Sequence, residues 1–403
     1  MVSRRTLLLG SSGLVLGTAV GCSGSGSAPG TAPSPDGPAA SPSPSRRTPP
    51  AAPSPTRTSS PSATPSGTPS TEPSPAVPEH PLPQLAGTVA DDLDVPWGIA
   101  FLRSGDAIVG ERDTGRLLRV GGTGRVRTLG TVAGVAARRG LGEGGLLGLA
   151  LAPGDEETLF AYLTSSSDNR VVRVSLAGGR VGKPTAVLPG IPTSTHHNGG
   201  RLLFDRDGML LVSTGDAEQS ALAQSRSSLA GKILRIRADG RAAPGNPFQN
   251  RTWSYGHRNV EGLAFDGAGR LWATEFGDKR ADELNLISRG KNYGWPMVEG
   301  RADDNRYTDP RLTWSPTSSC SPAGLAIAGS SAFIGALQGR CLFAVNLTGT
   351  TVGKAKAYFA GDHGRIRSVA LAPDGSLWMT TSNTDGRVTP GRHDDKILRV
   401  RLR

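Results

Sequence analysis

Residues 262–274 read GLAFDGAGRLWAT, and this phrase decides the fold. A short apolar run is followed by a turn of Asp and Gly, and a second apolar run comes after the turn. Runs of this length, separated by Gly- and Asp-rich turns, are typical of paired β-strands. From Leu85 onward no long helical period interrupts this pattern, so we predict an all-β domain.

The first run of this phrase recurs along the chain. Similar runs start at positions 98, 148, 201, 324 and 368, as in Gly98-Ile-Ala-Phe101 and Gly324-Leu-Ala-Ile327. Together with the run at 262 they define six units, whose starts lie 50, 53, 61, 62 and 44 residues apart. Each spacing fits one four-stranded sheet, so the repeat predicts a six-bladed β-propeller. A two-domain β-sandwich is the alternative architecture.

The units also share later strands. A second strand follows the turn, as at Ser376 to Met379, and several units end on a third strand, as at Ile397 to Val400. A single sheet would leave both faces exposed, so the sheets must stabilise one another. We expect Leu85–Ala90 to add a strand to the last sheet and close the ring, giving one domain over residues 85–403.

The first 84 residues have a different composition. They hold 18 of the 31 prolines, and residues 23–84 are rich in Pro, Ser, Thr and Ala, with few aromatic or branched apolar side chains. Such a segment cannot bury a core, so we predict a disordered linker over residues 23–84. It would serve as an extended stalk, and a spacer without a length requirement is the alternative.

Residues 1–22 have the features of an export signal. Arg4 and Arg5 form a twin arginine before a short apolar stretch, and Ala19-Val20-Gly21-Cys22 resembles a lipobox. We expect export by the twin-arginine route, acylation of Cys22, and a membrane contact made only through this lipid, on the outer face of the cell membrane. A plain signal peptide or a short membrane anchor is the alternative, although the apolar stretch is too short to span a bilayer stably.

Charge and cysteine content narrow the function classes. The formal net charge is +11, but the basic residues are scattered singly and form no long run. This distribution argues against nucleic-acid binding and suits a pocket for a multiply anionic small molecule. Cys320 and Cys341 flank a strand-like stretch and either form a disulfide or remain two buried thiols. Two cysteines without nearby His or Asp ligands make a poor zinc site.

Polar motifs gather where the predicted inner strands begin and where second strands end. His196-His197-Asn198 precedes the run at 201, Tyr255–Asn259 precedes the run at 262, and Gly215-Asp216 and Glu275–Asp278 end second strands. In a propeller such positions converge on one mouth of the central channel. A His, a carboxylate and an Arg gathered there suit proton abstraction with charge stabilisation, although each alone is also explained as a turn cap or a surface residue.

At these residues the chain resembles the soluble pyrroloquinoline-quinone (PQQ)-dependent aldose and glucose dehydrogenases. The likeness covers essentially Leu85–Arg403, and its motifs are specific only in combination. The motifs are Pro96–Phe101, Glu143–Gly148, His197–Leu202, Gly256–Asn259, Asp282–Asn285 and Asn292–Pro296.

The resemblance implies roles for individual residues. His197 would take the proton from the anomeric hydroxyl of a sugar, Asp216 would hold its imidazole, and Arg258 would stabilise charge at the quinone carbonyl. The residues implied to hold PQQ are Glu143, Asn259, Arg365 and Arg367.

The resemblance also implies calcium. The backbone carbonyls of Gly277 and Asp278 would bind a calcium ion that ligates the quinone and acts as a Lewis acid. A second, structural calcium would use Glu283, Tyr293 and Asp303.

The chain departs from the family pattern at several positions. The family often has Gln at the position of Glu143 and Pro at that of Asp278, and Gln338 replaces a cofactor-facing Lys, with Arg340 near enough in sequence to compensate. An extra carboxylate near an anionic cofactor is unfavourable unless calcium or an Arg offsets it. We expect His196 to point away from the site, because neighbouring strand residues face opposite sides.

Three functions follow from these patterns. Our main hypothesis is PQQ- and calcium-dependent oxidation of an aldose sugar at its anomeric carbon to the lactone, with electrons passed to an external acceptor. A calcium-dependent lactonase would need several side-chain carboxylates on its metal, where this chain offers mainly backbone ligands. A non-enzymatic propeller that binds glycans or proteins at the cell surface is the third hypothesis.

Overall fold

The structure is a computed structural model that describes residues 78–136 and 142–403. The predicted export signal with Cys22, and the predicted linker up to residue 77, lie outside the described residues. Helical structure in the described ranges is limited to three 3-10 turns, η1 (Ala177–Gly179), η2 (Ser220–Ala223) and η3 (Thr317–Ser319). In this part of the chain no helix has the length and apolar character needed to cross a bilayer.

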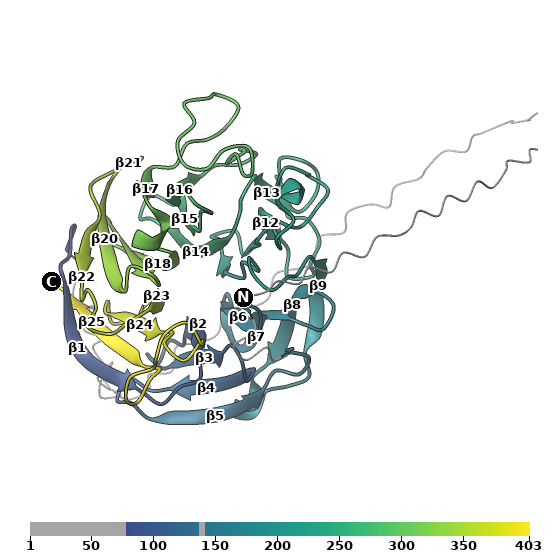
Figure 1. Cartoon of the computed structure of the whole chain (residues 1–403). Helices are drawn as coiled ribbons and strands as arrows, with labels where there is room; N and C mark the ends of the chain where they lie inside the picture. The colour runs from purple at the N-terminus through teal and green to yellow at the C-terminus, as the bar shows by residue number, and fades with distance from the viewer. Residues whose placement is uncertain (1–77, 137–141) are drawn as a thin grey trace, which may run out of the picture. The chain divides into compact units, whose positions relative to one another are not determined.

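The described residues form 25 strands in six antiparallel sheets, arranged in chain order around a centre (Figure 1). The first three sheets are β2 (Pro96–Phe101), β3 (Ala107–Glu111), β4 (Arg116–Val120) and β5 (Val126–Thr131); β6 (Leu146–Ala152), β7 (Asp155–Thr164), β8 (Asn169–Ser175) and β9 (Thr185–Ile191); and β10 (Leu202–Phe204), β11 (Leu210–Ser213), β12 (Lys232–Ile236) and β13 (Thr252–Tyr255).

The other three sheets follow the same plan. They are β14 (Val260–Phe265), β15 (Leu271–Glu275), β16 (Asp282–Ile287) and β17 (Leu312–Trp314); β18 (Pro322–Ala328), β19 (Ser331–Ala336), β20 (Cys341–Thr348) and β21 (Thr351–Val352), with β22 (Lys356–Tyr358) also paired to β20; and β23 (Ile366–Leu371), β24 (Leu377–Thr381), β25 (Ile397–Leu402) and β1 (Pro83–Ala90).

The ring closes through its first and last strands. β1 pairs with β25, and the inner strands contact one another in the order β2, β6, β10, β14, β18, β23 and again β2. The predicted six-bladed propeller is therefore confirmed, and the β-sandwich alternative is wrong. The predicted domain start at residue 85 is too late. Glu79 already accepts a backbone hydrogen bond from Ser330, and Leu82 exchanges two with Arg403, so these residues pair with the propeller.

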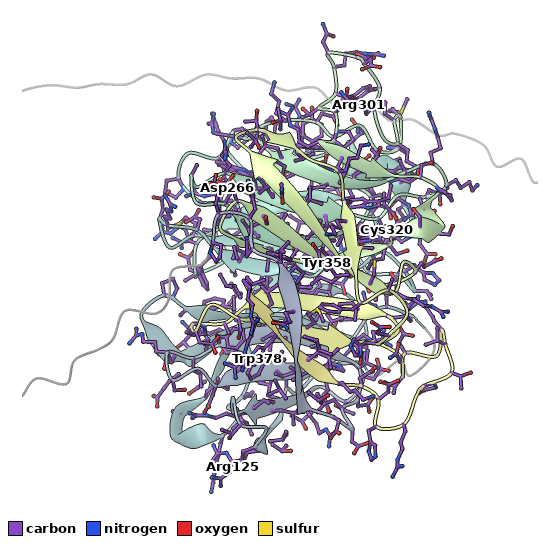
Figure 2. The ribbon with its side chains drawn as sticks, turned by 90° about the vertical axis from the view of Figure 1, so that its left-hand side faces the viewer. Arg125, Asp266, Arg301, Cys320, Tyr358 and Trp378 are labelled. Carbon is purple, nitrogen blue, oxygen red and sulfur yellow. The ribbon has the colours of Figure 1, made fainter. Side chains whose placement is uncertain are left out.

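Six apolar clusters hold the sheets together, one at each interface between neighbouring sheets. The largest fully buried side chains are Trp97, Trp272 and Trp378. Trp378 (Figure 2) packs edge-on against Phe101, with ring centroids 5.0 Å apart, and so joins the last sheet to the first. Burial of an apolar side chain contributes about 2 to 3 kcal/mol, which places most of the stability between the sheets.

The glycines that open the repeats have a steric cause. A Cβ at Gly98 would lie 2.5 Å from the carbonyl oxygen of Leu147 on the next inner strand. A Cβ at Gly148 would lie 2.1 Å from the carbonyl oxygen of Gly200. Inner strands approach most closely near the channel, where only glycine leaves room for the neighbouring backbone.

Candidate active site

One pocket of about 250 Å³ gathers most of the predicted site residues. Its walls come mainly from segments of five sheets that precede inner strands or follow second strands, as the propeller geometry predicts. The residues that line it are Glu143, His197, Arg258, Phe276, Gly277, Asp278, Asp282, Thr317, Ser321, Leu337, Gln338, Arg365, Arg367 and Arg387. A larger pocket of about 450 Å³ around Trp253 contains none of the predicted residues, and its Arg235 is already paired with Asp205 and Asp207.

The imidazole of His197 is oriented by one carboxylate. Its Nδ1 lies 2.8 Å from Oδ1 of Asp216, and because a carboxylate only accepts, Nδ1 carries the proton. Trp295 Nε1 donates to the other oxygen of Asp216 at 2.8 Å. With Nδ1 engaged, Nε2 is the nitrogen left to face the pocket. A neutral imidazole with a free Nε2 can take a proton from a bound hydroxyl group.

The backbone around His197 is fixed from two sides. Its φ is 58°, and its N–H donates to Oε2 of Glu143 at 2.9 Å. The side-chain oxygen of Asn259 accepts from the N–H of Gly199 at 2.9 Å. Asn259 is buried and absent from the pocket lining, so its role as a cofactor contact stays a prediction, while in the structure it supports the loop of His197.

His196 lies away from the pocket, as we expected, but for a different reason. Its Nδ1 is 3.1 Å from Glu218, and its side chain is 45% exposed against 17% for His197. Both histidines lie in a loop before β10 and not in a strand. The turn at His197, and not strand alternation, separates the two rings.

Three predicted arginines line the pocket, each held by a carboxylate. Arg258 donates to Asp278 at 3.1 Å, Arg367 to Glu261 at 2.6 Å and Arg365 to Asp385 at 3.2 Å. The Nε atoms of Arg258 and Arg367 are buried without a hydrogen-bond partner among the described residues. Such orphaned donors are rare in folded proteins, and acceptor oxygens of an anionic ligand would satisfy them. The donor set therefore fits a cofactor with several carboxylates.

Arg387 is a pocket residue that the sequence did not reveal. Its Nη2 donates to Oε1 of Glu143 at 3.0 Å. Burial raises the pKa of Glu143, but Arg387, the His197 N–H and Arg367 outweigh it and hold that pKa below its ordinary value. Glu143 is therefore an ionised side chain whose charge is offset. Gln338 also lines this pocket, whereas Arg340 lines a different one, so its compensation for a cofactor-facing lysine stays a prediction.

The segment after β15 presents oxygen atoms to the pocket. Glu299 Oε1 accepts from four consecutive backbone N–H groups, those of residues 278–281, at 2.7 to 3.1 Å. No described N–H donates to the carbonyl of Gly277, and that of Asp278 has only a long contact of 3.5 Å from Thr317. Asp282 lies beside them, and burial raises its pKa to about 7. Free carbonyls next to carboxylates form a donor set that fits a hard cation such as calcium.

No contact among the described residues brings the residues predicted for a second calcium together. The hydroxyl of Tyr293 donates to the carbonyl of Leu286, and Glu283 accepts from the N–H of Gly300. Burial and the nearby Glu275 raise the pKa of Glu283 to about 8. Asp303 is exposed on the loop that follows Arg301, which projects from the propeller (Figure 2). This ligand set is therefore not supported by the geometry.

Cys320 and Cys341 are free thiols in the structure, so the disulfide alternative is wrong and the buried-thiol alternative holds. Both lie in the apolar cluster between the fourth and fifth sheets. Burial raises the pKa of Cys341 to about 11 and that of Cys320 well above its ordinary value. Protonated, buried thiols of this kind pack as small apolar side chains.

Comparison with known proteins assigns the chain to a family. The family model described as glucose/sorbosone dehydrogenase matches residues 93–390. The chain belongs to this family. It is 29% identical to the aldose sugar dehydrogenase YliI of Escherichia coli over 339 residues, which is 74% of this chain and 90% of that protein. It is 30% identical over 257 residues to quinoprotein glucose dehydrogenase B of Acinetobacter calcoaceticus, 54% of each chain.

A solved structure supports the same assignment. The PQQ-bound form of aldose sugar dehydrogenase from Streptomyces coelicolor superimposes with a TM-score of 0.77 and 44% identity. The match covers 81% of this chain and all of that chain. As a glucose/sorbosone dehydrogenase family member with these relatives, the chain is an oxidoreductase.

Proposed function

We propose that this chain oxidises an aldose sugar at its anomeric carbon to the lactone, with PQQ as cofactor, calcium as its metal and an external electron acceptor. When bound, the quinone supplies a two-electron acceptor for the substrate hydride, and calcium supplies Lewis acidity. The observation that carries the proposal is the His197–Asp216 pair facing a pocket walled by arginines.

The chain's own residues divide the work in this proposal. Nε2 of His197 takes the proton of the anomeric hydroxyl, and the carboxylate of Asp216 stabilises the imidazolium that forms. Arg258 stabilises negative charge that develops on oxygen beside it. Arg365 and Arg367 bind cofactor carboxylates, and the carbonyls of Gly277 and Asp278 hold the calcium ion.

The experiment is a dye-reduction assay with the purified full chain, loaded with PQQ and calcium, on a panel of aldoses. A parallel titration measures PQQ binding. We expect quinone-dependent oxidation of at least one sugar and saturable binding. If no sugar is oxidised and PQQ does not bind, the proposal is contradicted. That outcome would favour a non-enzymatic propeller that binds glycans or proteins.

Matched histidine variants test the proposed base. His197→Ala should abolish turnover and leave PQQ binding largely intact, while His196→Ala, at the neighbouring exposed histidine, should leave both unchanged. Loss of PQQ binding in His197→Ala would instead assign this residue to the cofactor. The lactonase alternative is disfavoured, because among the described residues three His, Cys, Asp or Glu side chains come together only at Asp91, Asp92 and His393, outside the pocket.

We also propose that the protein is exported and lipid-anchored through Cys22, which rests on the sequence motif alone. Labelled palmitate should enter the wild-type chain and not Cys22→Ala. Equal labelling of the two chains would contradict acylation at this residue.

A further inference from the structure

Arg387 is fixed at the pocket wall by two carboxylates. It lies between β24 and β25, and its backbone N–H donates to Oδ1 of Asp385 at 3.1 Å. Its Nη2 donates to Glu143 at 3.0 Å, and its Nη1 lies 3.7 Å from Oδ2 of Asp385. Both the main chain and the guanidinium are therefore held, so this side chain is positioned before any ligand arrives.

Arg387 is also the most accessible of the four arginines that line the pocket. Its side chain is 34% exposed, against 12% for Arg258, 7% for Arg365 and 3% for Arg367. Its Nε and Nη1 donate no hydrogen bond to any described residue. A positioned guanidinium with unused donors at a pocket wall is suited to bind an anionic oxygen.

Glu143 links Arg387 to the loop of His197. One of its oxygens accepts from Arg387 and the other from the N–H of His197. The carboxylate thus serves the loop of His197, yet it places negative charge on the wall of a pocket lined by arginines. Two accounts explain the pair. Arg387 either only neutralises the charge of Glu143 or also binds the ligand.

We propose that Arg387 binds a carboxylate of the anionic quinone cofactor and that Glu143 holds its guanidinium in place for this contact. The inference rests on the proposed function, because it requires a cofactor that carries carboxylates. Arg387 then supplies a cationic contact that Gln338, which also lines the pocket, cannot make.

The experiment is a PQQ titration of the full chain in excess calcium. Binding is measured by the quenching of tryptophan fluorescence. The proteins compared are wild type, Arg387→Gln, Glu143→Gln and the double variant. We expect Arg387→Gln to weaken binding by about 10- to 100-fold, and the double variant to bind as weakly as Arg387→Gln. Glu143→Gln should lose less than Arg387→Gln, because the amide oxygen can still accept from Arg387, although the amide nitrogen then opposes the N–H of His197.

The double variant decides between the two accounts. If Arg387 only neutralises Glu143, removal of both charges restores wild-type affinity, and that outcome would overturn the inference. Arg392→Gln, at an exposed arginine of the same connection, controls for loss of one positive charge and should bind like wild type. Thermal melts of all variants verify folding. A wild-type chain that binds no PQQ would refute the proposed function, whereas wild-type affinity in Arg387→Gln would refute this inference alone.

Discussion

Asp216 lies 2.8 Å from His197, and this contact joins the loop before β10 to the loop after β11. Asp216 is almost fully buried, and its two oxygens also accept from Trp295 Nε1 and from the N–H of Glu218. All of these hydrogen bonds come from donors outside Asp216, so both of its oxygens act as acceptors. The carboxylate both orients the imidazole and supplies the charge that an imidazolium requires.

Asp216→Asn should lower turnover by about 100-fold or more and leave PQQ binding unchanged. An amide replaces one acceptor by a donor, so it opposes either His197 or Trp295, and it removes the negative charge. The measurement is kcat by dye reduction beside a PQQ titration. Trp295→Phe removes one donor but keeps the charge, so its kcat should fall less. A kcat that survives in Asp216→Asn would remove this carboxylate from proton transfer.

Glu299→Ala should weaken calcium binding by about tenfold or more, because one carboxylate oxygen holds the four N–H groups of residues 278–281. Glu299→Gln keeps an acceptor and should lose less. The rise in melting temperature with added calcium measures the affinity. Asp304→Ala, on the exposed loop nearby, is the control. Identical calcium dependence in wild type and Glu299→Ala would show that this segment binds no ion.

The propeller could be predicted from the sequence because the same strand pattern repeats six times along the chain. The glycine recurs at 98, 148, 262 and 324 because a Cβ at each of these positions would collide with the backbone of the next inner segment. The contact between Glu143 and Arg387 spans 244 residues and forms only when the ring closes. Nothing in the repeat marks Arg387, since it lies in a connection outside the strands. Such long-range pairs are visible only in the folded chain.

The fold brings part of the predicted site together for a similar reason. His197, Arg258 and Glu143 come from segments next to inner strands, and the fold brings these to one pocket. Asn259 follows the same rule, yet its amide faces Gly199 beneath the pocket, because its side-chain direction depends on packing. The residues predicted for a second calcium are not gathered in this way, because Asp303 belongs to an exposed loop outside the repeats, whose position the repeat pattern does not predict.

Arg201→Ala should lower the free energy of unfolding by about 3 kcal/mol or more. Its guanidinium donates to the carbonyl of Glu261 at 2.8 Å and to Ser368 at 3.2 Å, and it lies 4.2 Å over the ring of Trp97. One side chain thus joins four sheets around the channel. Burial lowers its pKa to about 10, so it stays charged at neutral pH.

Urea denaturation measures this effect. Arg206→Ala, at a partly exposed arginine of the following turn, should change the free energy of unfolding by less than about 0.5 kcal/mol. Equal losses in the two variants would mean that Arg201 holds no special place in the channel.

The pair of Glu143 and Arg387 should make stability depend on pH in the acid range. The pKa of Glu143 in the folded chain lies below its ordinary value of 4.5, because Arg387, the His197 N–H and Arg367 outweigh the opposing effect of burial. The ionised form therefore stabilises the fold above about pH 4.5, and this contribution is lost as the pH falls through the lower, folded pKa.

Glu143→Gln should be less stable than wild type by about 1 kcal/mol at pH 6. The two proteins should converge as the pH falls through the folded pKa of Glu143, because protonated Glu143 resembles glutamine. Melting temperatures from pH 3 to 6 measure the difference, with Glu156→Gln at an exposed ion pair as the control. A difference between Glu143→Gln and wild type that stays constant over this range would show that its cause is packing and not charge.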